Sequence, residues 1–317
     1  MKPRALILAV GISAFLSGCS VGPNYQPPSK GIPAEFAAGQ GSSLVSPETQ
    51  LWWRDLNDPI LDGLIDRALA QNLDIRSSLA RLEQAEAQLR GTGINEQISG
   101  SLTSSSTESG GDNLETTRTE TTTLTGSFVI DLFGGVKRGR EQALANLEAS
   151  GFNVGDSRAA VTLAVVSNYV SARFSQEAAQ LTRNTISSRR QTLSLVREKR
   201  ELGASSELDV AQAEADLFTA QADLEGYISD FEGAVFAIST LLDSAPLPLL
   251  KDLQQGARQP SAPSAGNLGV PADLLRNLPS VRSAERSYVA AVAEVGVQEA
   301  NLYPSLQLSG TVSGFET

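Results

Sequence analysis

The chain has 317 residues, 41% hydrophobic and 19% charged, so it is long and apolar enough to bury a large core. Acidic residues outnumber basic ones 36 to 25, and the formal charge of −11 disfavours nucleic-acid binding because no positive surplus can neutralise phosphates. The absence of histidine and the single cysteine exclude imidazole metal sites, zinc clusters, disulfides within the chain and Ser-His or Cys-His catalysis. We therefore expect no enzyme, no metal site and no cofactor.

The first 18 residues are typical of an export signal. Lys2 and Arg4 precede an apolar stretch, 5–15, that is too short to span a bilayer as a stable helix. Small residues then lead to Cys19, an arrangement that resembles the lipobox of bacterial lipoproteins. The resemblance implies a lipoprotein signal peptide at 1–18 and acyl chains on Cys19 that anchor the chain in lipid. The alternative is an ordinary signal peptide with a chance cysteine.

Three segments, 98–104, 122–132 and 304–314, alternate between apolar and polar residues and are expected to be strands. Such segments are typical of membrane barrels, although a half-buried soluble strand gives the same pattern. Three strands cannot close a barrel, and an open sheet edge is not tolerated in lipid, so strands in the membrane would require further chains. Residues 107–120 are expected to form an exposed loop. The polar faces of the second and third strands include Thr123, Thr125, Ser127, Ser305, Gln307, Ser309 and Thr311.

A long helix is expected between the second and third strands. From Val136 to Leu202 the sequence lacks proline and would measure about 100 Å as one helix. Gly151 and Gly155 each cost about 1 kcal/mol relative to alanine, which allows a kink or break near Asn153.

A turn and a returning helix follow. Gly203 suits a helix C-cap, and Ser206, three residues before Asp209, can cap the next helix, 206–243. Its apolar residues recur at alternating spacings of three and four, the pattern of a coiled-coil seam. The seam comprises Val210, Ala213, Leu217, Ala220, Leu224, Tyr227, Phe231, Ala234, Ile238 and Leu241.

The remaining sequence indicates an internal repeat. Residues 72–77 resemble 277–283, and in both copies a helical pattern gives way to an alternating one. Asp74 and Ser280 are good N-cap types at the start of these helices. Between the copies, residues 244–271 are rich in Pro, Gly, Ser and Ala and are expected to form an irregular belt.

The second copy stops soon after its strand, so we expect a truncated form of a protein of roughly 450 residues, which as written does not conduct. After the signal peptide, residues 19–317 would divide into an N-terminal extended segment (19–58), a first repeat (59–250), an equatorial segment (251–271) and an incomplete second repeat (272–317).

Several segments jointly resemble TolC-like outer membrane factors, specifically the lipoprotein branch that serves resistance-nodulation-division (RND) efflux pumps. They are the start of the mature chain at 19–28, the helical segment 52–75, Asp131-Leu132-Phe133-Gly134, the turn at 203–210 and the strand entry at 300–305. The resemblance implies a mainly α fold with membrane β: long helical hairpins form a periplasmic tunnel, and strands form part of a trimeric outer-membrane β-barrel.

By that resemblance the protein would be the outer-membrane channel of a tripartite efflux pump, a passive exit duct for drugs, metals or other toxic solutes. It would be lipid-anchored in the bacterial outer membrane and extend into the periplasm. Its partners would be outer-membrane lipid, two further copies in a homotrimer, a periplasmic adaptor (membrane fusion protein) and an inner-membrane RND pump. The polar strand faces would line the lumen. The hairpin tip would be a possible contact for the adaptor or pump, through Gly203, Ser206, Leu208 and Asp209, for which simple turn and capping roles are at least as well supported.

One other class of protein remains open, and a third, an enzyme, is disfavoured. A periplasmic coiled-coil structural or adaptor lipoprotein without a channel would carry the same helices, with soluble strands. An enzyme would need an acid pair in a pocket, whereas Asp and Glu lie mainly on helix faces, where solvated, salt-bridging surface is the usual explanation.

Overall fold

The computed structural model describes residues 20–27, 51–93, 97–111, 114–256, 258–261 and 277–316. The chain divides into two compact units. The first unit contains Met1–Pro33, Leu79–Val154 and Leu275–Thr317, and the second contains Ala34–Ser78 and Gly155–Leu274. Cys19 and the signal peptide lie outside the described residues. In the part of the chain that the structure describes, no helix has an apolar stretch long enough to cross a bilayer.

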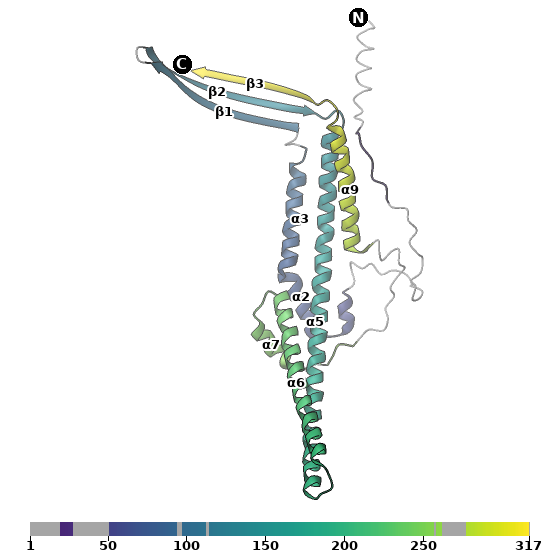
Figure 1. Cartoon of the computed structure of the whole chain (residues 1–317). Helices are drawn as coiled ribbons and strands as arrows, with labels where there is room; N and C mark the ends of the chain where they lie inside the picture. The colour runs from purple at the N-terminus through teal and green to yellow at the C-terminus, as the bar shows by residue number, and fades with distance from the viewer. Residues whose placement is uncertain are drawn as a thin grey trace. The chain divides into compact units, whose positions relative to one another are not determined.

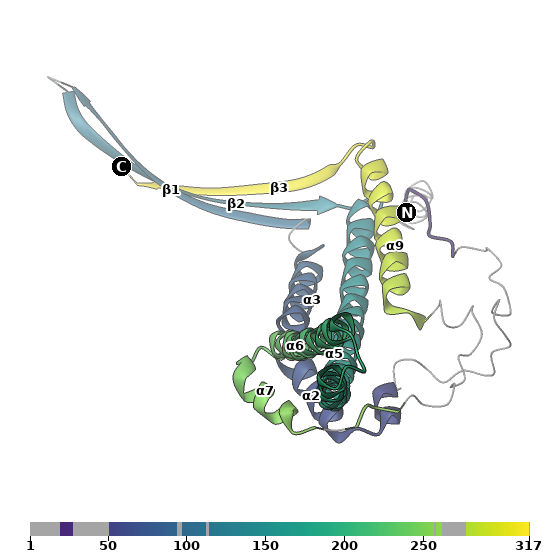
Figure 2. The ribbon, with the colours of Figure 1, turned by 60° about the horizontal axis from the view of Figure 1, so that its bottom comes forward.

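The first unit carries an antiparallel sheet of β1 (Ile98–Gly111), β2 (Leu114–Ile130) and β3 (Leu306–Glu316), with β2 in the middle (Figures 1 and 2). The three predicted strands are confirmed, but the exposed loop predicted at 107–120 is wrong. Thr107 pairs with Thr119 and Ser109 with Thr117, so both strands continue into this segment. The reason is that its threonines favour extended backbone and pair across the hairpin, which outweighs the polarity that suggested a loop.

A sharp turn joins β2 to the long helix α5 (Gly135–Glu201). The backbone at Gly134 has φ +77°, a left-handed conformation that favours glycine. The carboxylate of Asp131 accepts a 3.0 Å hydrogen bond from the backbone N–H of Lys137, one of the first N–H groups of α5 that lack a partner within the helix. The left-handed backbone of Gly134 and the hydrogen bond from Lys137 to Asp131 therefore define the conformation of the turn after β2.

Helix α5 is one continuous element of 67 residues, so the break allowed near Asn153 does not occur. The two glycines cost about 2 kcal/mol together, which is small for a helix that gains one hydrogen bond per added residue. Within the first unit, Asn153 also accepts a 2.6 Å hydrogen bond from Ser283 of α9 (Pro279–Ala300). Helix α9 begins at Pro279, and the residue before it makes no side-chain cap, so the capping role expected of Ser280 is wrong.

The second unit begins with the 3₁₀ helix η1 (Trp52–Leu56) and α2 (Pro59–Gln71) and includes the start of α3 (Leu73–Gly91). Asn72, rather than the expected Asp74, caps α3: its Oδ1 accepts from the backbone N–H groups of Asp74 and Ile75. The Asn72 amide also donates to the carbonyl of Leu241, which no local pattern reveals. The best-buried side chains here include Leu61, Ile65, Ile75, Val235, Ile238 and Leu242.

The predicted coiled-coil hairpin is confirmed. The second part of α5 packs against α6 (Glu207–Leu241) through a buried cluster of Ile186, Leu193, Val210, Leu217 and Ala220. Next along the chain lies α7 (Pro246–Gln254), with Leu249 and Leu253 buried, so the belt predicted at 244–271 is not wholly irregular. Pro246 and Pro248 lie in the first turn of α7, where a missing N–H costs no helical hydrogen bond.

Candidate functional site

The sheet has two chemically different faces. On one face, Leu102, Leu124 and Val312 lie opposite one another across the three strands, as do Ile98, Phe128 and Leu308. All six are exposed, Val312 to 73% of its surface. A contiguous exposed apolar patch of this kind marks a surface that contacts lipid or another protein.

The opposite face of the sheet carries hydroxyl groups in register. Ser99, Ser127 and Ser309 lie opposite one another, and the Oγ atoms of Ser99 and Ser127 are 2.5 Å apart. The structure therefore brings most of the predicted polar-face residues onto one face: Thr123, Thr125, Ser127, Gln307, Ser309 and Thr311. Ser305 is different, because it precedes β3 and lines a cavity of about 650 Å³ between the sheet and the helices of the first unit.

The apolar rows end part of the way along the strands. They begin at Ile130, paired with Leu306, and continue to Leu124, a distance of about 20 Å at 3.4 Å per residue. Beyond this point the same face turns polar: Glu120 lies opposite Glu316, and its side chain forms a 2.7 Å ion pair with Arg118. The sheet thus has an apolar band near the helices and a polar, charged far end.

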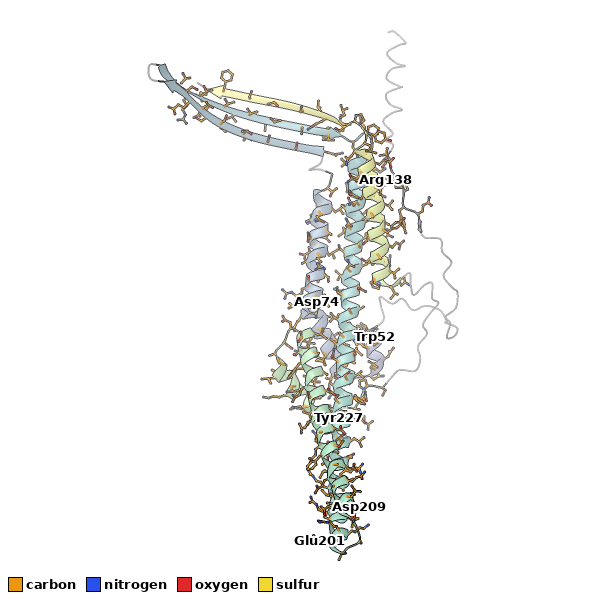
Figure 3. The ribbon with its side chains drawn as sticks, viewed as in Figure 1. Trp52, Asp74, Arg138, Glu201, Asp209 and Tyr227 are labelled. Atoms are coloured by element: carbon orange, nitrogen blue, oxygen red, sulfur yellow. The ribbon has the colours of Figure 1, made fainter. Side chains whose placement is uncertain are left out.

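Residues that the sequence singled out shape the hairpin tip, where Figure 3 labels one of them, Asp209. Gly203 has φ +75°, and its N–H donates to the carbonyl of Arg200, which ends α5. Ser206 and Asp209 form a reciprocal capping box at the start of α6. Hydrogen bonds from the Ser206 backbone and hydroxyl, and from the hydroxyl of Ser205, hold the pKa of the Asp209 carboxyl below its usual value.

Leu208 is the one predicted tip residue without a turn or capping contact, because its apolar side chain cannot cap a helix, and it is 73% exposed. Three ion pairs connect α5 to α6 behind it: Arg189 with Asp216, Arg197 with Glu214 and Arg200 with Glu207. The basic side chains come from α5 and the acidic ones from α6, so complementary charge adds to the apolar seam of the hairpin.

A second apolar stripe on α5 escaped the sequence prediction. Phe174, Leu181 and Leu195 of α5, and Leu202 directly after it, are all more than half exposed, whereas Leu193 is buried in the cluster with α6. Their numbers differ by multiples of seven, so the three within α5 lie near one side of the helix, with Ser188 interrupting the series. This spacing is visible in the sequence, and it would have identified a second contact face on α5.

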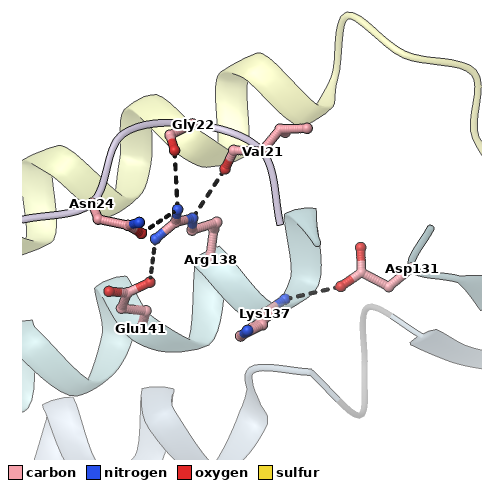
Figure 4. Close-up of polar contacts among 7 residues, drawn as sticks. All are labelled: Val21, Gly22, Asn24, Asp131, Lys137, Arg138 and Glu141. Atoms are coloured by element: carbon pink, nitrogen blue, oxygen red, sulfur yellow. Dashed lines mark hydrogen bonds and ion pairs between the residues drawn. The ribbon is translucent and has the colours of Figure 1, made fainter. Parts of the chain in front are cut away.

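The start of the described chain is held by a buried arginine that the sequence did not single out (Figure 4). Nε of Arg138 donates to the carbonyl of Val21, and Nη2 donates to the carbonyl of Gly22 and to Oδ1 of Asn24. Nη1 forms a 2.8 Å ion pair with Glu141. We call residues 20–25 together with Arg138 the N-terminal clasp.

Other contacts of the N-terminal clasp reach the β2–α5 turn and α9. The N–H of Val21 donates to the carbonyl of Phe133 at 3.1 Å. Tyr25 donates to Glu285 at 2.5 Å, which with burial raises the pKa of the Tyr25 hydroxyl, and its ring meets Tyr288 edge to face. No local sequence signal identifies these partners, since they are more than a hundred positions from the segment.

Among the described residues there is no cluster of three or more Cys, Asp or Glu side chains that could hold a metal ion.

Residues 64–242 match a protein family described as outer membrane efflux protein. Nodulation protein T of Rhizobium leguminosarum bv. trifolii is 34% identical over 306 residues, which is 95% of this chain and 65% of that protein. The probable efflux pump outer membrane protein TtgC of Pseudomonas putida is 28% identical over 323 residues, again 65% of its length. The chain thus spans about 65% of the length of the curated relatives that it matches.

Solved structures give the same result for the fold. The structure of the outer-membrane channel OprN aligns with a TM-score of 0.79 at 25% identity and covers 94% of this chain and 72% of that one. The long helices and antiparallel strands described above therefore match a known outer-membrane channel fold.

Proposed function

This chain belongs to the outer membrane efflux protein family, and on that premise we propose that it is the outer-membrane channel component of an efflux pump. The family consists of channels rather than enzymes, so the chain is not expected to catalyse a reaction. In the proposed role it is a passive exit duct, whose energy and selectivity come from a partner pump.

The observation that carries this proposal is the two-faced sheet of the first unit. Its rows of exposed Leu, Ile, Val and Phe suit hydrocarbon, and its opposite rows of Ser and Thr suit water. In the described sheet, β1 and β3 each leave one edge without a partner strand. Because lipid cannot satisfy such an edge, further strands must pair with it, and we propose that they come from a homotrimer with a shared barrel.

The second apolar stripe on α5 supports assembly independently. Phe174, Leu181 and Leu195 lie on a helix whose other face is already buried against α6, and Leu202 follows directly after that helix. Apolar residues at multiples of seven suit packing against another helix of a coiled coil. We infer that a neighbouring helix covers this stripe and that the helices together form the wall of a periplasmic tunnel.

The location that we propose is the bacterial outer membrane, with a lipid anchor on Cys19 and the helices in the periplasm. The anchor is supported by the lipobox-like residues before Cys19. Two or more acyl chains would hold the protein durably, since each buried CH₂ contributes about 0.8 kcal/mol.

The partners that we propose are a periplasmic adaptor and an inner-membrane RND pump, which would meet the hairpin tip. Gly203, Ser206 and Asp209 give the tip its shape, and Leu208 offers an exposed apolar side chain for contact. The cargo would be drugs, metals or other toxic solutes, a range that includes the toluene and the cation named for two efflux relatives.

We also propose that the chain is divided into a first repeat, 59–250, and an incomplete second repeat, 272–317, with the segment 251–271 between them.

Arginine substitutions at adjacent positions on the two faces of β2 test the proposal. Leu124→Arg places a charge on the apolar face and is expected to cost about 2–4 kcal/mol at mid-membrane. It should abolish heat-modifiable oligomers in outer-membrane fractions, whereas Thr125→Arg on the polar face should preserve them. If both variants behave alike, or if the chain lacking Cys19 is extracted as a water-soluble monomer, the coiled-coil lipoprotein without a channel is the better account.

A further inference from the structure

The N-terminal clasp holds the first described residues of the chain through several specific contacts. We propose that Arg138 is a positioning residue that fixes residues 20–24 against the β2–α5 turn and thereby sets the place of residue 19 and of a lipid attached to it. The first part concerns contacts of this chain alone, and the clause about lipid rests on the proposed attachment at Cys19.

The guanidinium of Arg138 is well suited to bind residues 20–24. Only 5% of its side chain is exposed, and it donates to two backbone carbonyls and one amide oxygen of the segment. Carbonyls at consecutive positions, Val21 and Gly22, match the planar fork of an arginine, whereas a lysine ammonium lacks this geometry. Glu141 offsets the buried charge. Because every residue offers a backbone carbonyl, the features that fix the register are the contact with the Asn24 side chain and the close approach of Gly22 to α9.

Two glycines allow the segment to approach this closely. Gly22 has φ +88°, and a Cβ added there would lie 2.4 Å from Cα of Gly296 on α9. A Cβ at Gly296 would in turn lie 2.9 Å from Cγ of Arg138. The backbone of Gly296 therefore lies between the backbone of Gly22 and the side chain of Arg138. Both positions require glycine because neither has room for a side chain.

Residues 20 and 21 also pack closely against the turn that follows β2. A Cβ at Gly134 would lie 2.8 Å from Cα of Ser20, and Val21 donates to the carbonyl of Phe133. Cys19 directly precedes Ser20 in the sequence, and the Cα atoms of neighbouring residues are about 3.8 Å apart across a trans peptide bond. This turn begins directly after Ile130, where the apolar rows of the sheet also begin. The clasp thus places an acylated residue 19 at the edge of the surface proposed to face lipid.

A nitroxide at position 23 reports on the clasp directly. Pro23 is exposed between the residues that Arg138 holds, so the full chain with Pro23→Cys carries the label without blocking the contacts. In membranes, Arg138→Ala and Gly22→Ala should each shorten the rotational correlation time of the label about threefold or more, and Arg138→Lys should give an intermediate value. The matched controls Arg140→Ala, exposed on the same helix, and Gly63→Ala, with open space at its Cβ, should leave it unchanged.

The number of reactive thiols separates this inference from the proposed lipid attachment. An acylated Cys19 leaves one free thiol in the Pro23→Cys chain, whereas two free thiols contradict the attachment. In that case the label is measured with Cys19→Ser in addition, and the clasp is still tested. Gly22→Ala lies on the segment itself, so it gives an answer even if Arg138→Ala disturbs α5. An unchanged label in Gly22→Ala, or equal mobility in Arg140→Ala and Arg138→Ala, would overturn the positioning role.

Discussion

The hydroxyl of Tyr169 donates a 2.6 Å hydrogen bond to Oδ2 of Asp58 and so joins α5 to the start of α2 within the second unit. The other carboxylate oxygen of Asp58 accepts from the backbone N–H groups of Ile60 and Leu61. Tyr169 is fully buried, and the guanidinium of Arg173 lies 5.0 Å from the centre of its ring. A single carboxylate therefore caps one helix and holds another.

Removing this hydroxyl should destabilise the second unit. Tyr169→Phe keeps the ring but leaves Oδ2 of the buried Asp58 carboxylate without this donor, at an expected cost of about 1–3 kcal/mol. Denaturant unfolding followed by circular dichroism measures the change. Tyr227→Phe on α6 is the matched control and should cost less than about 0.5 kcal/mol. Equal losses in the two variants would contradict the role assigned to the Tyr169–Asp58 bond.

The same pair predicts a stability change at high pH. Burial and the hydrogen bond to Asp58 raise the pKa of Tyr169 from 10.0 to about 12. A raised pKa means that the neutral hydroxyl is favoured in the folded chain, so its contribution is complete below pH 10 and is lost as pH rises from 10 towards 12. Unfolding free energies measured across this range should fall more steeply in the native chain than in Tyr169→Phe. Parallel curves for the two chains would be inconsistent with this linkage.

The second apolar stripe predicts an effect on assembly without an effect on folding. Leu181→Lys puts a charge on a side chain that is 68% exposed in the single chain, so the helical content should be unchanged. A neighbouring helix packed on the stripe would have to bury that charge, so oligomers captured by chemical cross-linking in membranes should decrease at least about tenfold. Ser187→Lys, also exposed on α5, should have little effect. Undiminished cross-linking in Leu181→Lys would show that no helix covers the stripe.

At the hairpin tip, shape and contact can be separated. Ser206→Ala removes the capping box and should lower the stability of the α5–α6 hairpin by about 1 kcal/mol. Leu208→Ala should leave stability unchanged because the side chain touches solvent, yet it should weaken pull-down of the chain by a periplasmic adaptor. Thermal unfolding measures the stability of both variants, and the pull-down measures their binding to the adaptor. A Leu208→Ala chain that binds normally would leave the tip with turn and capping roles alone.

The parts of this fold that the sequence predicts are those with a regular period. Alternation along β2 and β3 predicted which face would carry Thr125 and Ser309, and the three-four spacing predicted that Val210 and Leu217 would be buried. Both patterns are local, because each repeats within a few residues and reflects one exposed and one covered face. The reciprocal cap of Ser206 and Asp209 is local for the same reason.

What escaped prediction depends on distant partners or on competition between local signals. The interactions of Arg138 with Val21 and of Asn72 with Leu241 join positions far apart, and no spacing rule identifies them. The polarity of residues 107–120 suggested a loop, whereas cross-strand pairing of their threonines prolonged the strands. Gly151 suggested a weak point in α5, but one glycine is a small cost in a long cooperative helix.

The central claim is that the sheet faces lipid on one side and water on the other, and nitroxides at adjacent positions of β3 test it most directly. Leu308→Cys and Ser309→Cys each carry the label in outer-membrane vesicles. Their collision rates are measured with oxygen, which concentrates in hydrocarbon, and with a water-soluble nickel chelate. The account predicts that oxygen dominates at position 308 and nickel at position 309. A label at 308 that is shielded from both reagents, or is as open to nickel as the label at 309, would contradict it.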